Sequence, residues 1–161
     1  MPETIADTSV IQYLYQIGGL SLLPALYRTV QVPLAVEREL AEGHRLGVPL
    51  PDIGTVAWIQ VISLPPQNLV PQISGLGTGE REVISTAVDN PGSLALLDDA
   101  LARQYAKDLK VRVTGTLGIL LRAKQAELVK TIAPALDQLN ALGFRASYAT
   151  RLAVLRLAGE G

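Results

Sequence analysis

Carboxylates are the side chains of this sequence best suited to do chemistry. The chain of 161 residues has 15 Asp and Glu, one His and no Cys, which excludes thiol nucleophiles and zinc–thiolate sites. Asp7 comes directly after the apolar residues Ile5 and Ala6 and before an apolar helical pattern. This order is typical of a strand whose carboxyl end delivers a carboxylate into a crevice. Asp7 is therefore the first candidate for an acidic cluster.

Other carboxylates stand where the same crevice could receive them. The Asp98-Asp99 pair ends a later apolar run, Glu80 lies at the start of a helical pattern, and Glu39 lies inside another. Carboxylates held close together repel one another, and some of their pKa values rise unless a cation neutralises them. All-oxygen ligation suits Mg²⁺ or Mn²⁺. The pattern predicts a divalent metal site, although each residue alone also fits a helix cap or a place near a helix N-terminus.

Strand patterns and helical patterns alternate through most of the chain, and together they must position these carboxylates. Strands are expected at residues 3–8, 29–32, 59–64, 93–97 and 111–113. Helices are expected at residues 10–17, 20–27, 33–43, 52–58, 100–109 and 117–128. Another begins at residue 78 and ends at the turn 90–92, and two more are expected near the C-terminus, capped by Thr131 and Ser147. This alternation predicts one α/β domain, residues 1–161, with a mainly parallel sheet, helices on both faces and two extra C-terminal helices.

The charges of the chain are unevenly distributed. Residues 1–99 contain 11 acidic and 4 basic side chains, a balance of −7, whereas residues 100–161 contain 4 acidic and 10 basic ones, a balance of +6. An acidic half can concentrate a cation and a basic half attracts phosphate, which is the combination that a metal-dependent nuclease needs. The alternative is ordinary surface charge without a specific role.

Nothing in the composition indicates a membrane or secreted protein. Glu3 and Asp7 stand where a secretory signal has basic residues. No apolar run approaches the roughly 18 residues of a membrane-spanning helix. We expect a soluble, cytoplasmic protein without a membrane partner.

Five short motifs follow one another along the chain. They are Ile5-Ala6-Asp7-Thr8-Ser9, Val36-Glu37-Arg38-Glu39-Leu40, Gly77-Thr78-Gly79-Glu80-Arg81-Glu82-Val83-Ile84, Leu96-Leu97-Asp98-Asp99 with Ala102-Arg103, and Val113-Thr114-Gly115-Thr116-Leu117-Gly118. In this order they resemble the motifs of the PIN domain, over essentially the whole chain. The resemblance is greatest to prokaryotic PIN-like proteins, relatives of VapC-type toxins, with a Gly-Thr-Leu-Gly turn after the last strand.

The resemblance implies a three-layer α/β/α fold and an endoribonuclease that hydrolyses RNA with Mg²⁺ or Mn²⁺. It also implies that the protein could be the toxin of a VapBC-type pair, with an antitoxin partner, and a homodimer. Carried over by position, the family's catalytic carboxylates are Asp7, Glu39, Glu80 and Asp99, and the metal ligands are Asp7, Glu80, Asp98 and Asp99. Glu82 competes with Glu80, and Asp98 with Asp99, for the role of ligand.

The chain departs from the family pattern at Leu97, where many members have Thr or Ser before the last carboxylate. This departure leaves open a second interpretation, a catalytically weak PIN-like module that binds nucleic acid or regulates. A third is a phosphate-binding or receiver-like α/β domain, although the chain has no Walker-type phosphate loop.

Several polar residues close to these carboxylates in sequence could contact a substrate. Hydroxyls could come from Thr8, Ser9 and Thr116, and flanking phosphates could bind Arg81, Arg103 and Lys107. Alternatively, each basic side chain simply lies on the solvent-exposed face of its helix. Aromatic residues are 4% of the chain, so stacking of bases on aromatic rings is poorly supported.

Overall fold

Parallel strands form the centre of the structure, a computed structural model that describes residues 2–161. The five strands found there are β1 (Thr4–Ala6), β2 (Val30–Pro33), β3 (Ile59–Ile62), β4 (Leu94–Leu96) and β5 (Arg112–Thr114), in the order β3-β2-β1-β4-β5. Every pairing is parallel, and Ile5 of the central strand lies opposite Gln31 and Ala95. The carboxyl ends of all strands therefore lie at one edge of the sheet.

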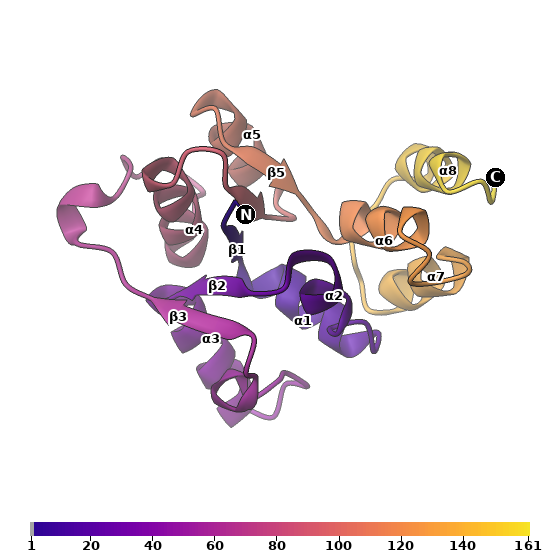
Figure 1. Cartoon of the computed structure of the whole chain (residues 1–161), viewed down its shortest axis with the longest axis horizontal. Coiled ribbons are helices and arrows are strands. Elements are labelled where there is room, and N and C mark those ends of the chain that lie inside the picture. The colour runs from indigo at the N-terminus through magenta and orange to yellow at the C-terminus, as the bar shows by residue number, and fades with distance from the viewer. Residues whose placement is uncertain (1) are drawn as a thin grey trace.

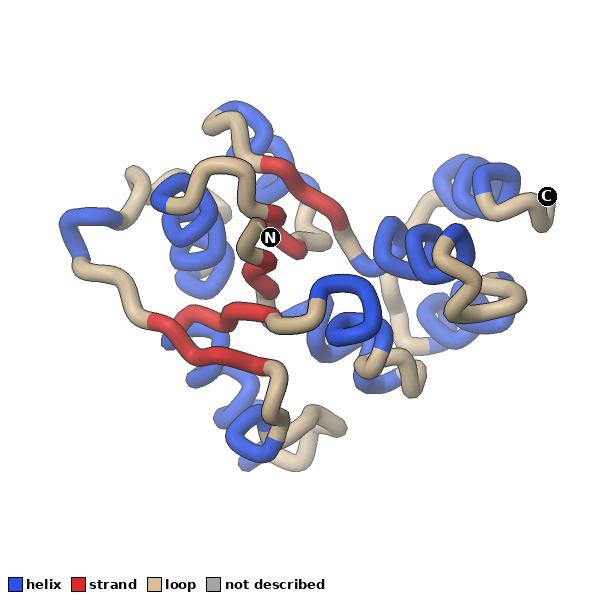
Figure 2. The backbone as a smooth tube through the Cα atoms, viewed as in Figure 1, coloured by secondary structure: helices blue, strands red, loops and turns tan. Residues whose placement is uncertain are grey.

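Helices cover both faces of this sheet (Figures 1 and 2). They are α1 (Thr8–Gln16), α2 (Leu22–Tyr27), α3 (Leu34–Arg45), α4 (Thr78–Asp89), α5 (Ala100–Asp108), α6 (Thr116–Gln125), α7 (Ala133–Ala141) and α8 (Tyr148–Leu157), with short 3₁₀ helices at Ile53–Thr55 and Pro66–Asn68. In Figure 1, α4 lies on one side of the sheet, and α1 and α2 lie on the other. The expected three-layer α/β/α fold with a parallel sheet is confirmed.

The sheet is held in place by burial on both faces. All three residues of β1 are buried, and Ile5, Val32 and Leu96 have no exposed surface. Strands that are covered on both sides need apolar residues at successive positions, not only at alternate ones. The central strand is therefore a rigid base for the residue that follows it, Asp7.

The observed elements differ from the expected ones mainly at their ends. β1, β3 and β4 are shorter than expected, and β2 and β5 are each shifted by one residue. α3 continues past Gly43 to Arg45, and the helix expected at 52–58 is only a 3₁₀ turn at Ile53–Thr55. Asp52 caps that turn as expected, because its carboxylate accepts from the N–H of Gly54 at 3.2 Å. No helix of residues 2–161 is both long enough and apolar enough to cross a membrane.

The start of α7 is also different, since Thr131 does not cap it. The cap position is Ile132, and the carboxylate of Glu160 accepts from the N–H groups of Ile132 and Ala133 at 2.9 and 3.1 Å. Glu160 also pairs with Lys124 of α6 at 3.0 Å. One carboxylate near the C-terminus thus connects α6 to the start of α7, and Figure 1 shows α6, α7 and α8 gathered together.

Glu82 joins α3 to α4 in a similar way. The N-cap of α3 is Pro33, which offers no side-chain hydrogen bond. The Glu82 carboxylate accepts instead from the N–H of Ala35 at 3.1 Å. A donor at a helix N-terminus that loses its acceptor costs free energy.

Replacing Glu82 with Ala should therefore lower the free energy of unfolding by about 1–2 kcal/mol, because the N-terminus of α3 loses this acceptor. Urea unfolding followed by circular dichroism measures the change. The variant Glu82→Gln is the matched control, since its amide oxygen can still accept from Ala35, and it should lose less. Equal stability of Glu82→Ala and the unmodified protein would contradict this role.

Candidate active site

An open pocket of about 620 Å³ lies at the carboxyl end of the central strand. Five carboxylates line it, from four parts of the chain: Asp7 after β1, Glu39 of α3, Glu80 of α4, and Asp98 and Asp99 after β4. β1 and β4 are neighbours in the sheet, so the residues that follow them meet despite a separation of about 90 positions along the chain. The structure thus brings these five candidate carboxylates to one pocket, and Glu82, the alternative to Glu80, is not among them.

Asp7 is the most buried of these carboxylates, with 5% of its surface exposed. Burial raises the pKa of Asp7 from 3.8 to about 8; the N–H of Thr8 opposes this shift, and the charges of Glu80, Glu39 and Asp98 add to it. Asp7 occupies the N-cap position of α1, yet its side chain makes no capping hydrogen bond. Helix capping therefore does not explain this carboxylate.

Asp98 is held by the start of α6. Its two oxygens accept from the N–H and the hydroxyl of Thr116, each at 2.7 Å, and the Ser9 hydroxyl lies 3.5 Å away. Burial raises the pKa of Asp98, and the two bonds from Thr116 work against that rise. Leu97, where many family members have Thr or Ser, is buried in the core, so the hydroxyls that contact Asp98 come from Thr116 and Ser9.

Asp99 has a different local role. Its carboxylate caps α5 by accepting from the N–H of Ala102 at 3.0 Å, and the residue is exposed. Both Asp98 and Asp99 line the pocket, so the structure keeps both as candidate ligands. Asp98 is the one with a fixed orientation from two strong hydrogen bonds.

Glu80 and Glu82 are separated by the geometry of α4. Glu80 lines the pocket and accepts from the N–H of Gly77 at 2.8 Å, whereas Glu82 is bonded to α3. Residues two apart on a helix lie on opposite sides of it. Burial raises the pKa of Glu80, the bond from Gly77 lowers it, and the charges of Asp99 and Glu39 raise it further.

Two glycines let the carboxylates approach the backbone closely. A Cβ atom at Gly79 would lie 2.6 Å from an oxygen of Glu39 and 3.2 Å from an oxygen of Asp7, and one at Gly115 would lie 2.6 Å from an oxygen of Asp98. The Glu39 carboxylate also accepts from the Thr8 hydroxyl at 2.6 Å. Any larger residue at position 79 would force the Glu39 carboxylate to move from its place beside Asp7.

The carboxylates are not yet arranged around a single point. Within residues 2–161, no three acidic or histidine side chains converge closely enough to hold one ion in their present orientations. Four of the five carboxylates accept hydrogen bonds, from Thr8, Gly77, Thr116 and Ala102. Carboxylate oxygens suit a hard divalent cation, and at least some of these side chains must turn toward one point in the pocket to share one.

The residues expected to contact substrate divide into two groups. Thr8 and Ser9 line the acidic pocket, Thr116 holds Asp98, and Arg103 lines an adjoining cavity of about 360 Å³ that also contains Asp98. Arg81 and Lys107 line neither cavity. The guanidinium of Arg81 donates to the carbonyl of Val70 at 2.7 Å, on the outer side of α4, and Lys107 is exposed near the end of α5.

Several residues that line the acidic pocket were not predicted from the sequence. Gln12 and Tyr13 belong to α1, and Phe144 and Arg145 follow α7. Tyr13 could have been inferred, because it lies four positions after Ser9 and so on the same face of the helix. No sequence pattern around Phe144 and Arg145 indicates a place in the pocket, because only the packing of the C-terminal helices brings them there.

The raised pKa of Asp7 predicts how stability depends on pH in the metal-free protein. The folded state holds a proton that the unfolded state releases above about pH 4, so stability should fall as the pH rises toward 8. Asp7→Asn removes this pH-dependent loss of stability, so the free energy of unfolding at pH 8 should rise by on the order of a few kcal/mol. Urea unfolding in EDTA at several pH values measures it.

Asp137→Asn is the control, because that carboxylate is exposed on α7 and pairs only with Arg151. It should leave the pH dependence unchanged. The remaining slope in Asp7→Asn comes from Asp98 and Glu80, whose pKa values are also raised. If the slope of Asp7→Asn equals that of the unmodified protein, Asp7 does not carry a raised pKa.

Comparison with known proteins agrees with this geometry. The family model DUF3368, a PIN domain, matches residues 3–160. No curated protein matches the chain. PIN domains are generally nucleases, and they generally use divalent metal ions. With a matching family model over nearly the whole chain and its carboxylates gathered at the ends of parallel strands, the protein belongs to the PIN-domain family.

Proposed function

We propose that the protein is a metal-dependent endoribonuclease that hydrolyses phosphodiester bonds of RNA with Mg²⁺ or Mn²⁺. The observation that supports it best is the buried Asp7 carboxylate, which has three other carboxylates beside it and no capping role. Such a group is ionised at neutral pH only if a cation compensates it. RNA as the substrate follows from the resemblance to VapC-type proteins.

The proposed ligands are Asp7, Glu80, Asp98 and Asp99, with Glu39 as a further catalytic carboxylate. A bound divalent ion would supply positive charge to the phosphate oxygens and lower the pKa of a water molecule. The chain contributes the orientation of the ligands: β1 fixes Asp7, Thr116 holds Asp98, and Thr8 holds Glu39. Arg103, beside Asp98, is available for a neighbouring phosphate.

One observation favours a second candidate function, a PIN-like module that binds nucleic acid and cleaves it poorly. In residues 2–161 no three acidic or histidine side chains form a group that could hold one ion as they are oriented. Turning the side chains toward a shared ion would cost free energy and weaken metal binding. An antitoxin partner and a homodimer stay predictions from the family resemblance.

The first test is cleavage of single-stranded RNA with Mn²⁺ or Mg²⁺. Product should require the metal, and Asp7→Asn should lower kcat by about 100-fold or more, because even residues that only support metal ligands often cost 10- to 100-fold. Glu82→Gln is the control and should cleave normally, since Glu82 lies outside the pocket. Intact RNA after long incubation, together with unchanged RNA binding by Asp7→Asn, would favour the second function.

The second test concerns Thr116, whose side chain is completely buried. Thr116→Val keeps the shape but removes the hydroxyl that orients Asp98, so Mn²⁺ should bind about 10- to 100-fold more weakly. Thr116→Ser keeps the hydroxyl and should bind nearly as well as the unmodified protein. Isothermal titration with Mn²⁺ gives the affinities, and equal affinities for Val and Ser would exclude this role of the hydroxyl.

A further inference from the structure

Two of the few aromatic residues of the chain meet at the wall of the acidic pocket. The sequence has five Tyr, one Phe and one Trp. The rings of Tyr13 and Phe144 lie with their centroids 4.9 Å apart and their planes at 86°, an edge-to-face contact. Both residues are half-buried and line the pocket that contains the five carboxylates.

Phe144 is held in this place by the end of α7. Gly143 has φ +85°, and the N–H of Phe144 donates to the carbonyl of Leu139 at 3.0 Å. This is the pattern of a Schellman motif, which fixes the direction of the chain after a helix. The connection of α7 to Glu160 at its other end holds the same helix in the fold. The ring of Phe144 is therefore carried by a fixed turn.

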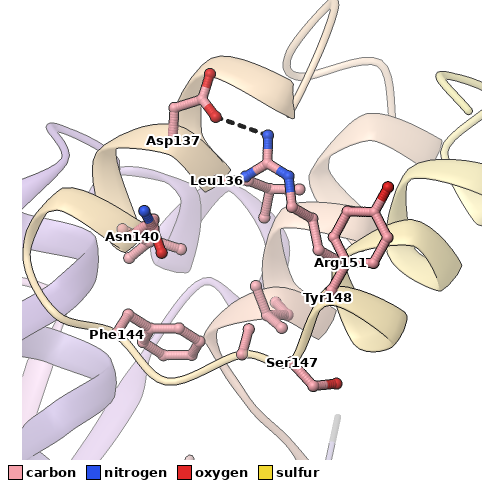
Figure 3. A pocket seen from close by; sticks show the side chains of 10 residues that line it. Leu136, Asp137, Asn140, Phe144, Ser147, Tyr148 and Arg151 are labelled. Carbon is pink, nitrogen blue, oxygen red and sulfur yellow. Dashed lines mark hydrogen bonds and ion pairs between the residues drawn. The ribbon is translucent and has the colours of Figure 1, made fainter.

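Phe144 also stands where three cavities adjoin. Besides the acidic pocket it lines the cavity of about 360 Å³ that contains Arg103, and a third of about 350 Å³ beside α7 and α8. Figure 3 shows the third cavity, with Phe144 on one side of it and Tyr148 and Arg151 on the other. A ring that borders several cavities keeps part of its surface free of contact with other side chains.

The charges next to this ring change sign from one cavity to the next. The acidic pocket has five carboxylates and one basic residue, Arg145. The cavity of about 360 Å³ has one carboxylate, Asp98, and two basic residues, Arg103 and Arg145. A phosphate chain with one phosphate at the carboxylates and their metal would find its next favourable site beside these arginines.

We propose that Phe144, supported by Tyr13, is the surface on which the base next to the scissile phosphate stacks, and that Arg145 binds the phosphate of that nucleotide. This inference rests on the proposed nuclease function. Stacking on one aromatic ring tolerates every base, because each base has a π face. A base inside a duplex is already stacked on its neighbours, so this surface favours unpaired nucleotides.

Binding of labelled RNA with Ca²⁺ in place of Mg²⁺ or Mn²⁺ tests the proposal, and gel analysis checks that the RNA stays uncleaved. By fluorescence anisotropy, the unmodified protein should prefer a single strand to a duplex of the same sequence. Phe144→Leu keeps an apolar side chain but removes the ring, and should bind the single strand about 10- to 100-fold more weakly. Removing the base at the stacking position of the RNA should weaken binding to a similar extent, and it should add little to the effect of Phe144→Leu.

Tyr148→Leu is the matched control, because Tyr148 is an exposed aromatic residue that lines the third cavity but not the acidic pocket. It should bind RNA like the unmodified protein. Arg145→Ala should weaken binding of all RNA sequences and reduce the slope of log affinity against log salt by about one. Arg145→Lys keeps the charge, so it should retain most of the RNA affinity and most of the salt dependence.

Two outcomes separate this inference from the proposed function. Equal affinities of the unmodified protein and Phe144→Leu, or equal loss in Tyr148→Leu, overturn the stacking role even if Mn²⁺-dependent cleavage is observed. If the stacking results are as expected but no metal supports cleavage, the base-binding surface stands and the nuclease proposal fails. Circular dichroism of each variant checks that it is folded.

Discussion

The candidate site depends on one destabilising arrangement, a carboxylate buried at the end of the central strand. Asp7 is 5% exposed, and three other carboxylates raise its pKa further. Without a cation the group must take up a proton or destabilise the fold. Proteins keep such groups where they serve a function, because a neutral residue of similar shape would be more stable there. The apolar, doubly covered sheet provides the rigidity that this arrangement requires.

Around Asp7, the chain orients the other carboxylates with hydrogen bonds from short local segments. Thr8 and Thr116 bind Glu39 and Asp98 through their hydroxyls, and the backbone N–H groups of Gly77 and Ala102 bind Glu80 and Asp99. The bonds from Thr116 and Gly77 lower the pKa values of Asp98 and Glu80 and partly offset the effect of burial. Each bond to Glu39, Glu80 and Asp99 uses one carboxylate oxygen and leaves the second oxygen free for another partner.

The C-terminal helices complete the pocket from outside the sheet. Glu160 accepts from the start of α7 and pairs with Lys124 of α6, which fixes α7 relative to the core. The turn at the other end of α7 then carries Phe144 and Arg145 to the rim. A ring and a guanidinium beside an acidic pocket supply what the carboxylates lack, an apolar contact and a positive charge for the substrate.

The sequence by itself determined the strands, the helices and the carboxylates at the strand ends, because apolar periodicity and the residues that follow it are local properties. It also suggested Thr8, Ser9 and Thr116 as sources of hydroxyls near these carboxylates. Only the tertiary structure decided that Glu80 rather than Glu82 lines the pocket, that Arg81 is directed to Val70, and that Glu160 caps α7 in place of Thr131. Phe144 and Arg145 likewise reach the site only through helix packing. Contacts between distant segments depend on how the whole chain buries its apolar surface, and no local pattern records that.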